Sequence, residues 1–207
     1  MRLTDGPIGL RPIRSGDARA WREVRARNIG WLAPWEATPP PGGDHGPRGF
    51  GAMARMLRAQ ARAGTCLPFV VTYAESGGDR LVGQLTVSGI TYGSARWGQI
   101  GYWIDQAYAG RGIIPTAVAL ATDHCFFVLG LHRLEIHIRP ENVASLRVVE
   151  KLGFRPEGLR RAYLHINGAW RDHLTFAMCA EDVPEGLLTR WHRSRHRRPD
   201  PPSEQHV

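Results

Sequence analysis

Residues 101–125, "GYWIDQAYAGRGIIPTAVALATDHC", contain the turn that decides the fold of this chain. An apolar, aromatic run leads into Gly110, Arg111 and Gly112, and apolar residues then recur at helical spacing from Ile114 to Leu129. Two glycines let the backbone come close to a ligand, and a helix that starts directly after them offers free amide hydrogens and a partial positive charge. The stretch therefore predicts a strand, a phosphate-binding turn and a helix.

The residues that follow complete a strand–helix–strand unit. Gly130 is a typical helix C-cap, residues 134–138 alternate apolar with polar side chains, and Pro140 ends the run. A helix that connects two strands in this way implies that the strands run parallel.

The remaining patterns predict antiparallel strands around this unit. Four upstream strand candidates are separated by turns or helices, and Asn167-Gly168 marks a closing β-hairpin. The expected strands cover residues 8–14, 67–75, 80–92, 95–104, 134–138, 159–166 and 169–178. The expected helices cover residues 15–28, 50–64, 114–129 and 142–152, and a long loop is expected over residues 31–48. These elements predict an α/β (α+β) fold.

Length, composition and charge predict one domain with a basic end. The 207 residues are 43% hydrophobic and 22% charged, which is typical of a single globular domain, here residues 1–191. Residues 192–207, "HRSRHRRPDPPSEQHV", carry four arginines and two acidic residues, and this composition predicts a disordered tail. The tail is a candidate for ribosome or RNA contact, although most of the net charge of +8 lies elsewhere.

The sequence also predicts where the protein resides and how its thiols behave. No apolar run approaches the roughly 20 residues that cross a bilayer, and the start lacks a secretory signal, so we expect a cytoplasmic protein without membrane contact. Cys66, Cys125 and Cys179 are widely spaced within apolar patterns, which predicts buried thiols and no metal site. A monomer and a homodimer are both compatible with the sequence.

Two common phosphate-binding motifs do not fit the turn. A P-loop needs a Gly-Lys pair, and the chain has none. A dinucleotide fingerprint needs a third small residue where Pro115 stands. Nucleotide hydrolysis and hydride transfer are therefore disfavoured.

The segment "YAGRGIIPTAV" after "GYWID", followed by "ENVASLRVVEKLGF", resembles the acetyl-coenzyme A (acetyl-CoA) site of the GNAT superfamily of N-acetyltransferases. The resemblance implies the GNAT fold, a central mixed, mostly antiparallel twisted sheet of about seven strands with about four helices. In that family the strand before the turn, here through Trp103 and Ile104, splays from its neighbour and pairs with the pantetheine arm. The loop amides that bind the pyrophosphate correspond here to Ala109, Gly110, Arg111, Gly112 and Ile113. Ala107 stands where the family usually has Arg or Gln.

The downstream segment supplies two further candidates through this resemblance. In such enzymes an asparagine at the position of Asn142 contacts pantetheine, and a serine at the position of Ser145 lies near the coenzyme sulfur. The alternative is that Asn142 only caps its helix and Ser145 only solvates the first turn. Ser145 is the candidate acid for the departing thiolate, with Tyr163 as the second choice and a strand aromatic as its alternative role.

The segments "WLAPWEATPP" and "YLHINGAWRDHLTFAM" resemble the RimJ and RimL branch of the superfamily, which acetylates the N-terminal residue of ribosomal proteins. This resemblance implies a protein N-terminus as acceptor, with Trp31, Trp35 and Glu36 as candidates for receiving it. Core packing is the alternative role of the two tryptophans. A small amine such as an antibiotic or polyamine is the alternative acceptor, and a coenzyme-binding or RNA-associated protein without catalysis is the alternative from another class.

The implied reaction is direct attack of the amine on the thioester within a ternary complex. Candidate bases are Glu36, Asp105, Glu135 and His137, with salt bridging or solvation as the competing role of each. Because no dedicated base is evident, an α-amine is favoured over lysine as the acceptor, since part of the α-amine is already neutral near pH 7.

Overall fold

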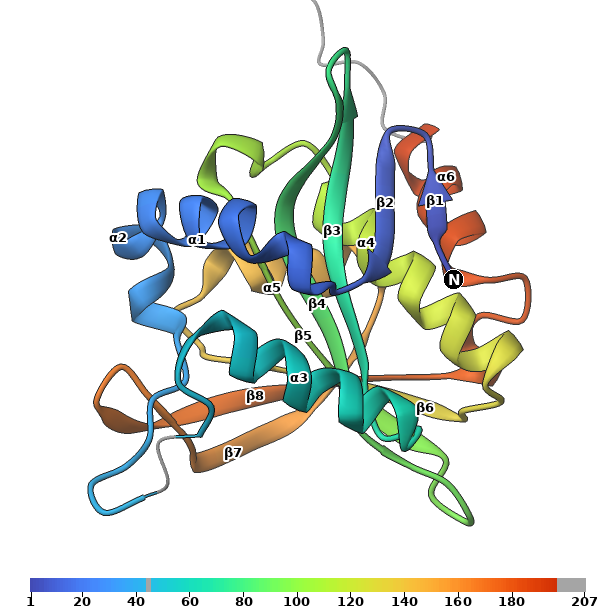
Figure 1. Cartoon of the computed structure of the whole chain (residues 1–207). Coiled ribbons are helices and arrows are strands. Elements are labelled where there is room, and N and C mark those ends of the chain that lie inside the picture. Colours follow the sequence, from blue (N-terminus) through green and yellow to red (C-terminus); the bar gives the residue numbers. More distant parts are fainter. Residues whose placement is uncertain (44–45, 197–207) are drawn as a thin grey trace, which may run out of the picture.

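The computed structural model describes residues 1–43 and 46–196, and its centre is an eight-stranded sheet with the order β1-β2-β3-β4-β5-β6-β8-β7 (Figure 1). Every neighbouring pair is antiparallel except β5 and β6, which run parallel as the strand–helix–strand unit requires. The strands are β1 Leu3–Asp5, β2 Ile8–Pro12, β3 Leu67–Glu75, β4 Gly78–Thr91, β5 Trp97–Ile104, β6 Arg133–Ile138, β7 Arg155–Ile166 and β8 Ala169–Cys179. The mixed, mostly antiparallel sheet is confirmed. It has one more strand than expected because β1 is too short to show alternation.

Helices cover both faces of this sheet (Figure 1). Those of the described residues are α1 Ala18–Arg27, α2 Ile29–Leu32, α3 Gly49–Arg62, α4 Ile113–Asp123, α5 Val143–Leu152 and α6 Leu187–His196. Helices α4, α5 and α6 share one hydrophobic core with the sheet, whereas α1 and α3 pack with Val70 and Leu81 in a second core. Val71 and Val82, the next residues along β3 and β4, belong to the first core because successive side chains of a strand point to opposite faces.

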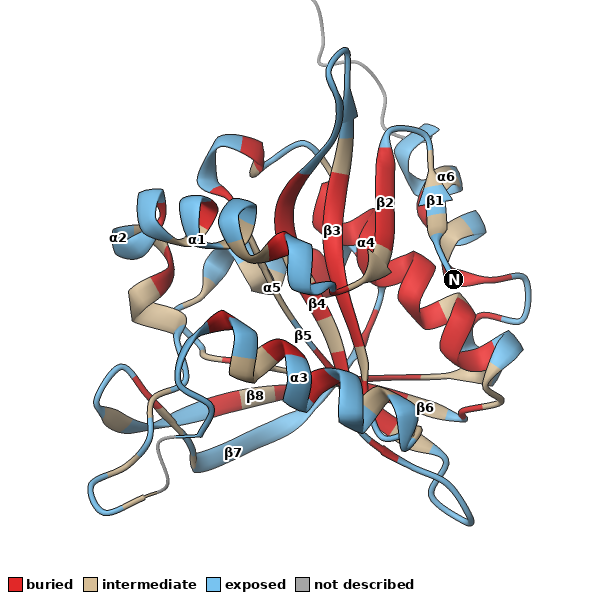
Figure 2. Ribbon diagram, viewed as in Figure 1, coloured by how far each residue is buried: buried red, intermediate tan, exposed pale blue. Residues whose placement is uncertain are grey.

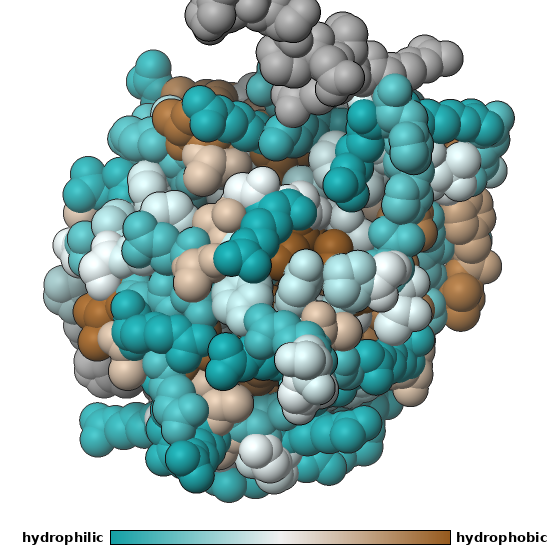
Figure 3. Space-filling model, turned by 90° about the horizontal axis from the view of Figure 1, so that it is seen from above, coloured by the Kyte–Doolittle hydropathy of each residue, from teal (hydrophilic) through white to brown (hydrophobic). Residues whose placement is uncertain are grey.

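Burial is concentrated on the central strands and on α4 (Figure 2). Residues 113–122 are all buried because α4 lies between the sheet on one side and α5 and α6 on others. The face seen from above is mainly hydrophilic, with apolar side chains in small groups (Figure 3). Within the described ranges, no helix is long and apolar enough to cross a membrane.

The sheet opens between its two parallel strands. Residues Trp97 to Gln99 of β5 pair with Arg133 to Glu135 of β6, and the pairing then stops. Strand β5 continues to pair with β4 as far as Ile104, while β6 continues to pair with β8 as far as Ile138. The second half of β5 therefore presents one backbone edge to the gap that separates it from β6.

Three expectations are corrected at the chain's loops and end. Residues 31–48 are not loop throughout, because α2 and a 3-10 turn, Ala33–Trp35, form its first part; residues 44–45 lie outside the described residues. The helix expected to run to Leu129 ends as α4 at Asp123 and continues as a wider π turn, His124–Val128. The tail expected from His192 is helical in α6 as far as His196, because buried Leu187 and Trp191 dock this helix; residues 197–207 lie outside the described part.

Asp105, at the end of β5, fixes the entry to the glycine turn. Its buried carboxylate accepts hydrogen bonds from Arg27 Nε (3.0 Å), Asn28 Nδ2 (2.8 Å) and the amide of Ala107 (3.2 Å). Burial raises the pKa of Asp105, but the hydrogen bonds from Arg27 and Asn28 outweigh it and hold the pKa below the usual 3.8. The carboxylate thus connects the end of α1 to the segment that leads into the turn.

We expect Asp105→Asn to lower the free energy of unfolding by about 2 kcal/mol at pH 7, because charged hydrogen bonds at a buried site are lost. This loss of stability should be complete above about pH 5. It should shrink as the pH falls through the lowered pKa of Asp105, since the wild-type carboxyl then also becomes neutral. Urea unfolding between pH 3 and pH 7 measures this. Asp79→Asn, which removes an exposed partner of Arg2, is the control and should change stability by less than about 0.5 kcal/mol. A loss in Asp105→Asn that did not shrink in acid would contradict the assignment.

Candidate active site

Beside the end of β5, where its pairing with β6 has stopped, lies a cavity of about 480 Å³, within the size range of small-molecule sites. Its walls come from the α2 segment, the end of β5, the glycine turn with the start of α4, and α5. The structure brings most sequence-predicted residues to it: Trp31, Trp35, Trp103, Ile104, Ala109, Gly110, Gly112, Ile113, Asn142 and Ser145. Segments that are more than 100 residues apart in the chain thus meet at one opening.

The glycine turn has the backbone geometry that its sequence predicts. Gly110 has φ 79° and Gly112 has φ 76°, both in the left-handed region that side chains disfavour. Gly112 is the N-cap of α4, and no side chain caps this helix end. The first amides of α4 therefore lie at the cavity without a capping side chain, as an anion-binding helix start requires.

The positively charged side chains that line the cavity do not include Arg111 of the glycine turn. The guanidinium of Arg111 lies over the Tyr108 ring and donates to the carbonyl of Ala107 (2.9 Å), and Arg111 does not line the cavity. Arg147 and Lys151 of α5 do line it. Sequence reasoning missed both, although their four-residue spacing places them on one side of the predicted helix.

Asn142 and Ser145 take part in the N-cap of α5 and also lie at the cavity. The side-chain oxygen of Asn142 accepts a hydrogen bond from the amide of Ser145 (3.1 Å), so the capping role of Asn142 is confirmed. Both residues also line the cavity. The bond uses the Ser145 amide and leaves its hydroxyl out of the cap.

Tyr102 is a cavity residue that sequence reasoning missed. Its hydroxyl is buried and has no hydrogen-bond partner among the described residues. Burial raises the pKa of this phenol above its usual value of 10.0, and Ser145 is the polar group that opposes the shift. Tyr102 therefore stays protonated and places an unused O–H donor in the cavity wall near Ser145.

The two tryptophans expected at the acceptor side form one wall. The indole N–H of Trp31 donates to the carbonyl of Ile104 (3.2 Å), and the Trp35 ring lies under the guanidinium of Arg139, 5.3 Å from the ring centre. Arg139 also donates to the carbonyl of Pro34 (2.7 Å), which ties this segment to the end of β6. Both tryptophans are half-buried at the cavity.

Two predicted catalytic residues lie outside the cavity lining. The carboxylate of Glu36 is exposed and forms an ion pair with Arg25. Tyr163 on β7 packs against the rings of His137 and His173, with the Arg160 guanidinium over its ring. Both residues are far from the glycine turn in the sequence, so the sequence did not show that they lie outside the cavity lining.

The other candidate bases are engaged in buried contacts. Glu135 is buried and forms ion pairs with Arg133 (2.8 Å) and Arg160 (3.2 Å). Burial, with a contribution from Arg160, lowers the pKa of His137 to about 4, so this imidazole is neutral at pH 7 but only weakly basic. Asp105 is committed to Arg27 and Asn28. The Glu135 and Asp105 carboxylates are thus held by cationic partners, and the His137 imidazole is a weak base.

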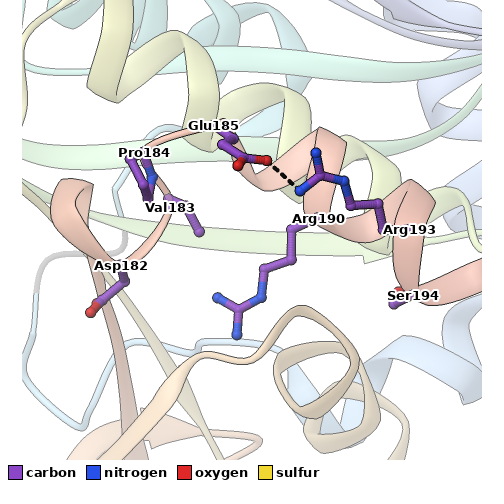
Figure 4. A pocket seen from close by; sticks show the side chains of 8 residues that line it. Asp182, Val183, Pro184, Glu185, Arg190, Arg193 and Ser194 are labelled. Carbon is purple, nitrogen blue, oxygen red and sulfur yellow. Dashed lines mark hydrogen bonds and ion pairs between the residues drawn. The ribbon is translucent and has the colours of Figure 1, made fainter.

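A second hollow lies between α6 and the segment that precedes it, residues 182–186 (Figure 4). Its arginines are occupied by structural contacts: Arg193 forms an ion pair with Glu185, and the Arg190 guanidinium lies against Gly153 at the C-terminal end of α5. A cation at this helix end is favoured by the helix dipole. The hollow is therefore a packing feature of α6.

One group of described residues could in principle hold a metal ion. His132, Cys179 and Glu181 place potential ligand atoms within 4.8 Å of one another, at the end of β6 that is remote from the cavity. His132 and Glu181 are exposed, and the guanidinium of Arg155 lies 3.5 Å from the carboxylate of Asp182, the residue that follows Glu181. That positive charge opposes a cation at this place.

A mixed sheet that opens between two parallel strands, with a glycine turn and helix start at the opening, defines the GNAT class of acetyltransferases. Residues 8–155 match the family model described as an acetyltransferase (GNAT) domain. The chain belongs to this family; it is an N-acetyltransferase that takes its acetyl group from acetyl-CoA.

Particular relatives refine this placement. The structure of Mycobacterium smegmatis RimJ in complex with CoA-disulfide is 41% identical, with a TM-score of 0.82, and the match covers 94% of this chain and 93% of that one. The [Ribosomal protein uS5]-alanine N-acetyltransferase of Escherichia coli is 27% identical over 186 residues, 90% of this chain and 94% of that protein. A protein of Bacillus subtilis named "Probable N-acetyltransferase YjcK" is 42% identical over 104 residues, which are 50% of this chain and only 58% of YjcK.

We expect Gly112→Val to weaken coenzyme A binding by about tenfold, because a β-branched residue is strained at φ 76°. The new Cβ would lie in contact with the Trp191 ring, at 3.6 Å, so the valine methyl groups beyond it have little room. Isothermal titration calorimetry with coenzyme A measures the change.

Gly93→Val is the matched control, since Gly93 has φ 72°, has open space around it and lies in the turn between β4 and β5. This variant carries similar backbone strain and should keep wild-type affinity. Gly112→Val that bound coenzyme A as tightly as the wild type would disprove the role of the turn.

Proposed function

We propose that this enzyme acetylates the N-terminal α-amine of a protein, such as a ribosomal protein, by direct attack of the amine in a ternary complex. The observation that carries the proposal is the opening between β5 and β6, with the glycine turn on one side and the tryptophan segment on another. Both segments line the same cavity, so donor and acceptor can share it. The RimJ structure and the uS5-alanine N-acetyltransferase, which match nearly the whole chain, support this choice of acceptor.

The residues of the cavity fit acetyl-CoA, which supplies the acetyl group as a thioester. The open edge of β5 offers the backbone amide of Ile104 to the pantetheine arm, whereas Trp103, the other candidate, pairs with Gln84, so its backbone groups face β4. The amides from Ala109 to Ile113 suit the pyrophosphate, and Arg147 and Lys151 supply positive charge beside it. A backbone amide near Trp103 or Ile104 is also placed to stabilise a developing oxyanion.

Proton transfer to the leaving thiolate falls to Ser145 in this proposal. Its hydroxyl is free of the helix cap, and Tyr102 presents a buried donor in the same wall. The remote position of Tyr163 makes it the weaker choice, and Glu36 is paired with Arg25. No strong base is needed: an α-amine with a pKa near 8 is about one-fifth neutral at pH 7.4, whereas a lysine is only about one part in a thousand neutral.

The lining of the cavity also bears on the acceptor. Glu141 is the sole carboxylate among the described lining residues, and Arg139 pairs with it (3.2 Å). Arg147 and Lys151 leave the lining positive, which disfavours a polycation such as a polyamine. The half-buried faces of Trp31 and Trp35 are suited to the apolar side chain and backbone of a peptide end.

We expect Ser145→Ala to lower kcat by about a hundredfold while the KM for acetyl-CoA changes by less than about threefold, because general acid catalysis is lost and binding is kept. The helix cap survives, since it uses the Ser145 amide. Steady-state kinetics of thiol release measures this, with Ser94→Ala in the exposed β4–β5 turn as control. A kcat within twofold of the wild type would remove Ser145 from this role.

The acceptor is tested with matched peptides. We expect a peptide that begins with a free alanine to be acetylated at least about tenfold faster than the same peptide with a blocked N-terminus and an internal lysine, because of the difference in neutral amine. Mass spectrometry locates the acetyl group. Faster acetylation of the lysine peptide, or of spermidine, would contradict the proposed acceptor.

A further inference from the structure

Helix α6 connects several elements that surround the coenzyme site. The carboxylate of Asp123, at the end of α4, accepts hydrogen bonds from the amides of Leu187 (2.6 Å) and Leu188 (3.1 Å) at the start of α6. Farther along α6, His192 contacts Asp5 of β1 (3.0 Å). The helix is thus held at its start and near its middle, and it lies against α4 (Figure 1).

Trp191 is the residue of α6 that reaches the glycine turn. Its indole N–H donates to the hydroxyl of Thr116 in the first turn of α4 (2.9 Å), and both side chains are buried. Its Cζ2 atom lies 3.6 Å from the position that a Cβ on Gly112 would occupy. The amide of Thr116 in turn donates to the carbonyl of Gly112 (3.1 Å). One aromatic ring, which does not line the cavity, therefore supports both Gly112 and the first turn of α4.

This support has a consequence for affinity. A turn with two left-handed glycines has many backbone conformations of similar energy, and only some of them direct the amides into the cavity. The observed dissociation constant increases when the binding-competent fraction decreases. A rigid ring that packs on Gly112 and hydrogen-bonds Thr116 restricts the turn and the helix start before the coenzyme arrives.

We propose that Trp191 is a positioning residue for the coenzyme, which holds the Gly110–Gly112 turn and the start of α4 in the conformation that binds pyrophosphate. The inference rests on the proposed placement of the pyrophosphate at this turn. Trp191 does not line the cavity, so it acts through Gly112 and Thr116 and not by contact with the substrate. The C-terminal helix thereby becomes part of the coenzyme-binding apparatus.

Trp191→Phe and Thr116→Val test the positioning role. Each removes one partner of the same hydrogen bond and leaves an apolar side chain in its place. We expect each to increase the dissociation constant for coenzyme A about three- to tenfold, and the double variant to be little worse than either single one. The KM for acetyl-CoA should increase in parallel, and kcat at saturating acetyl-CoA should stay within about twofold. Calorimetry and steady-state kinetics measure these values on protein shown by circular dichroism to be folded.

Two controls separate positioning from general destabilisation. Leu57→Ala removes a buried side chain from α3, on the other face of the sheet, and Arg193→Ala removes an exposed side chain from α6 itself. Both should keep the wild-type affinity for coenzyme A. Equal weakening in Leu57→Ala would overturn the proposal, because the effect would then follow stability alone.

The outcomes also separate this inference from the proposed function. Wild-type affinity in both Trp191→Phe and Thr116→Val, or a loss of kcat without a change in affinity, would overturn the role of Trp191. If Gly112→Val weakens coenzyme binding while Trp191→Phe does not, only the role of Trp191 fails. If Gly112→Val binds coenzyme normally, the placement of the pyrophosphate itself fails.

Discussion

The loss of pairing between β5 and β6 after Gln99 is the constraint on which the rest of this structure depends. Unpaired backbone groups inside a protein are costly, so such an opening persists only where other groups satisfy them. Each strand keeps its outer partner, β4 or β8, and the Trp31 indole donates to the Ile104 carbonyl at the open edge. The opening therefore remains stable, and a cavity lies beside the unpaired end of β5.

The glycine turn at this opening is supported from two directions. On the entry side, the Asp105 carboxylate gathers Arg27, Asn28 and the Ala107 amide. On the exit side, α4 is buried in the core, and its first residues line the cavity. Because left-handed glycines provide close approach but no rigidity of their own, the surrounding packing must supply the rigidity. The conformation of the glycine turn therefore depends on how the core packs around it.

The features that sequence predicted correctly are those with a local physical cause. Gly110 and Gly112 required left-handed backbone, Asn167-Gly168 required a tight hairpin, and alternation marked β6. Sequence missed β1, which is only three residues long, and α6, which is strongly basic and docks through few apolar side chains. The second half of α6, from His192, has the composition of a disordered tail, and only the docking of this helix against α4 shows otherwise.

Sequence alone determined the local parts of the candidate site, because the turn, the helix start and the Asn142 cap are set by residues adjacent in the chain. Tertiary structure alone decided which distant side chains complete it. Tyr102 and Arg147 reach the cavity, while Glu36 and Tyr163 do not line it. The physical reason is that local backbone preference acts over a few residues, whereas the composition of a cavity depends on how strands separate and helices pack across the whole sheet.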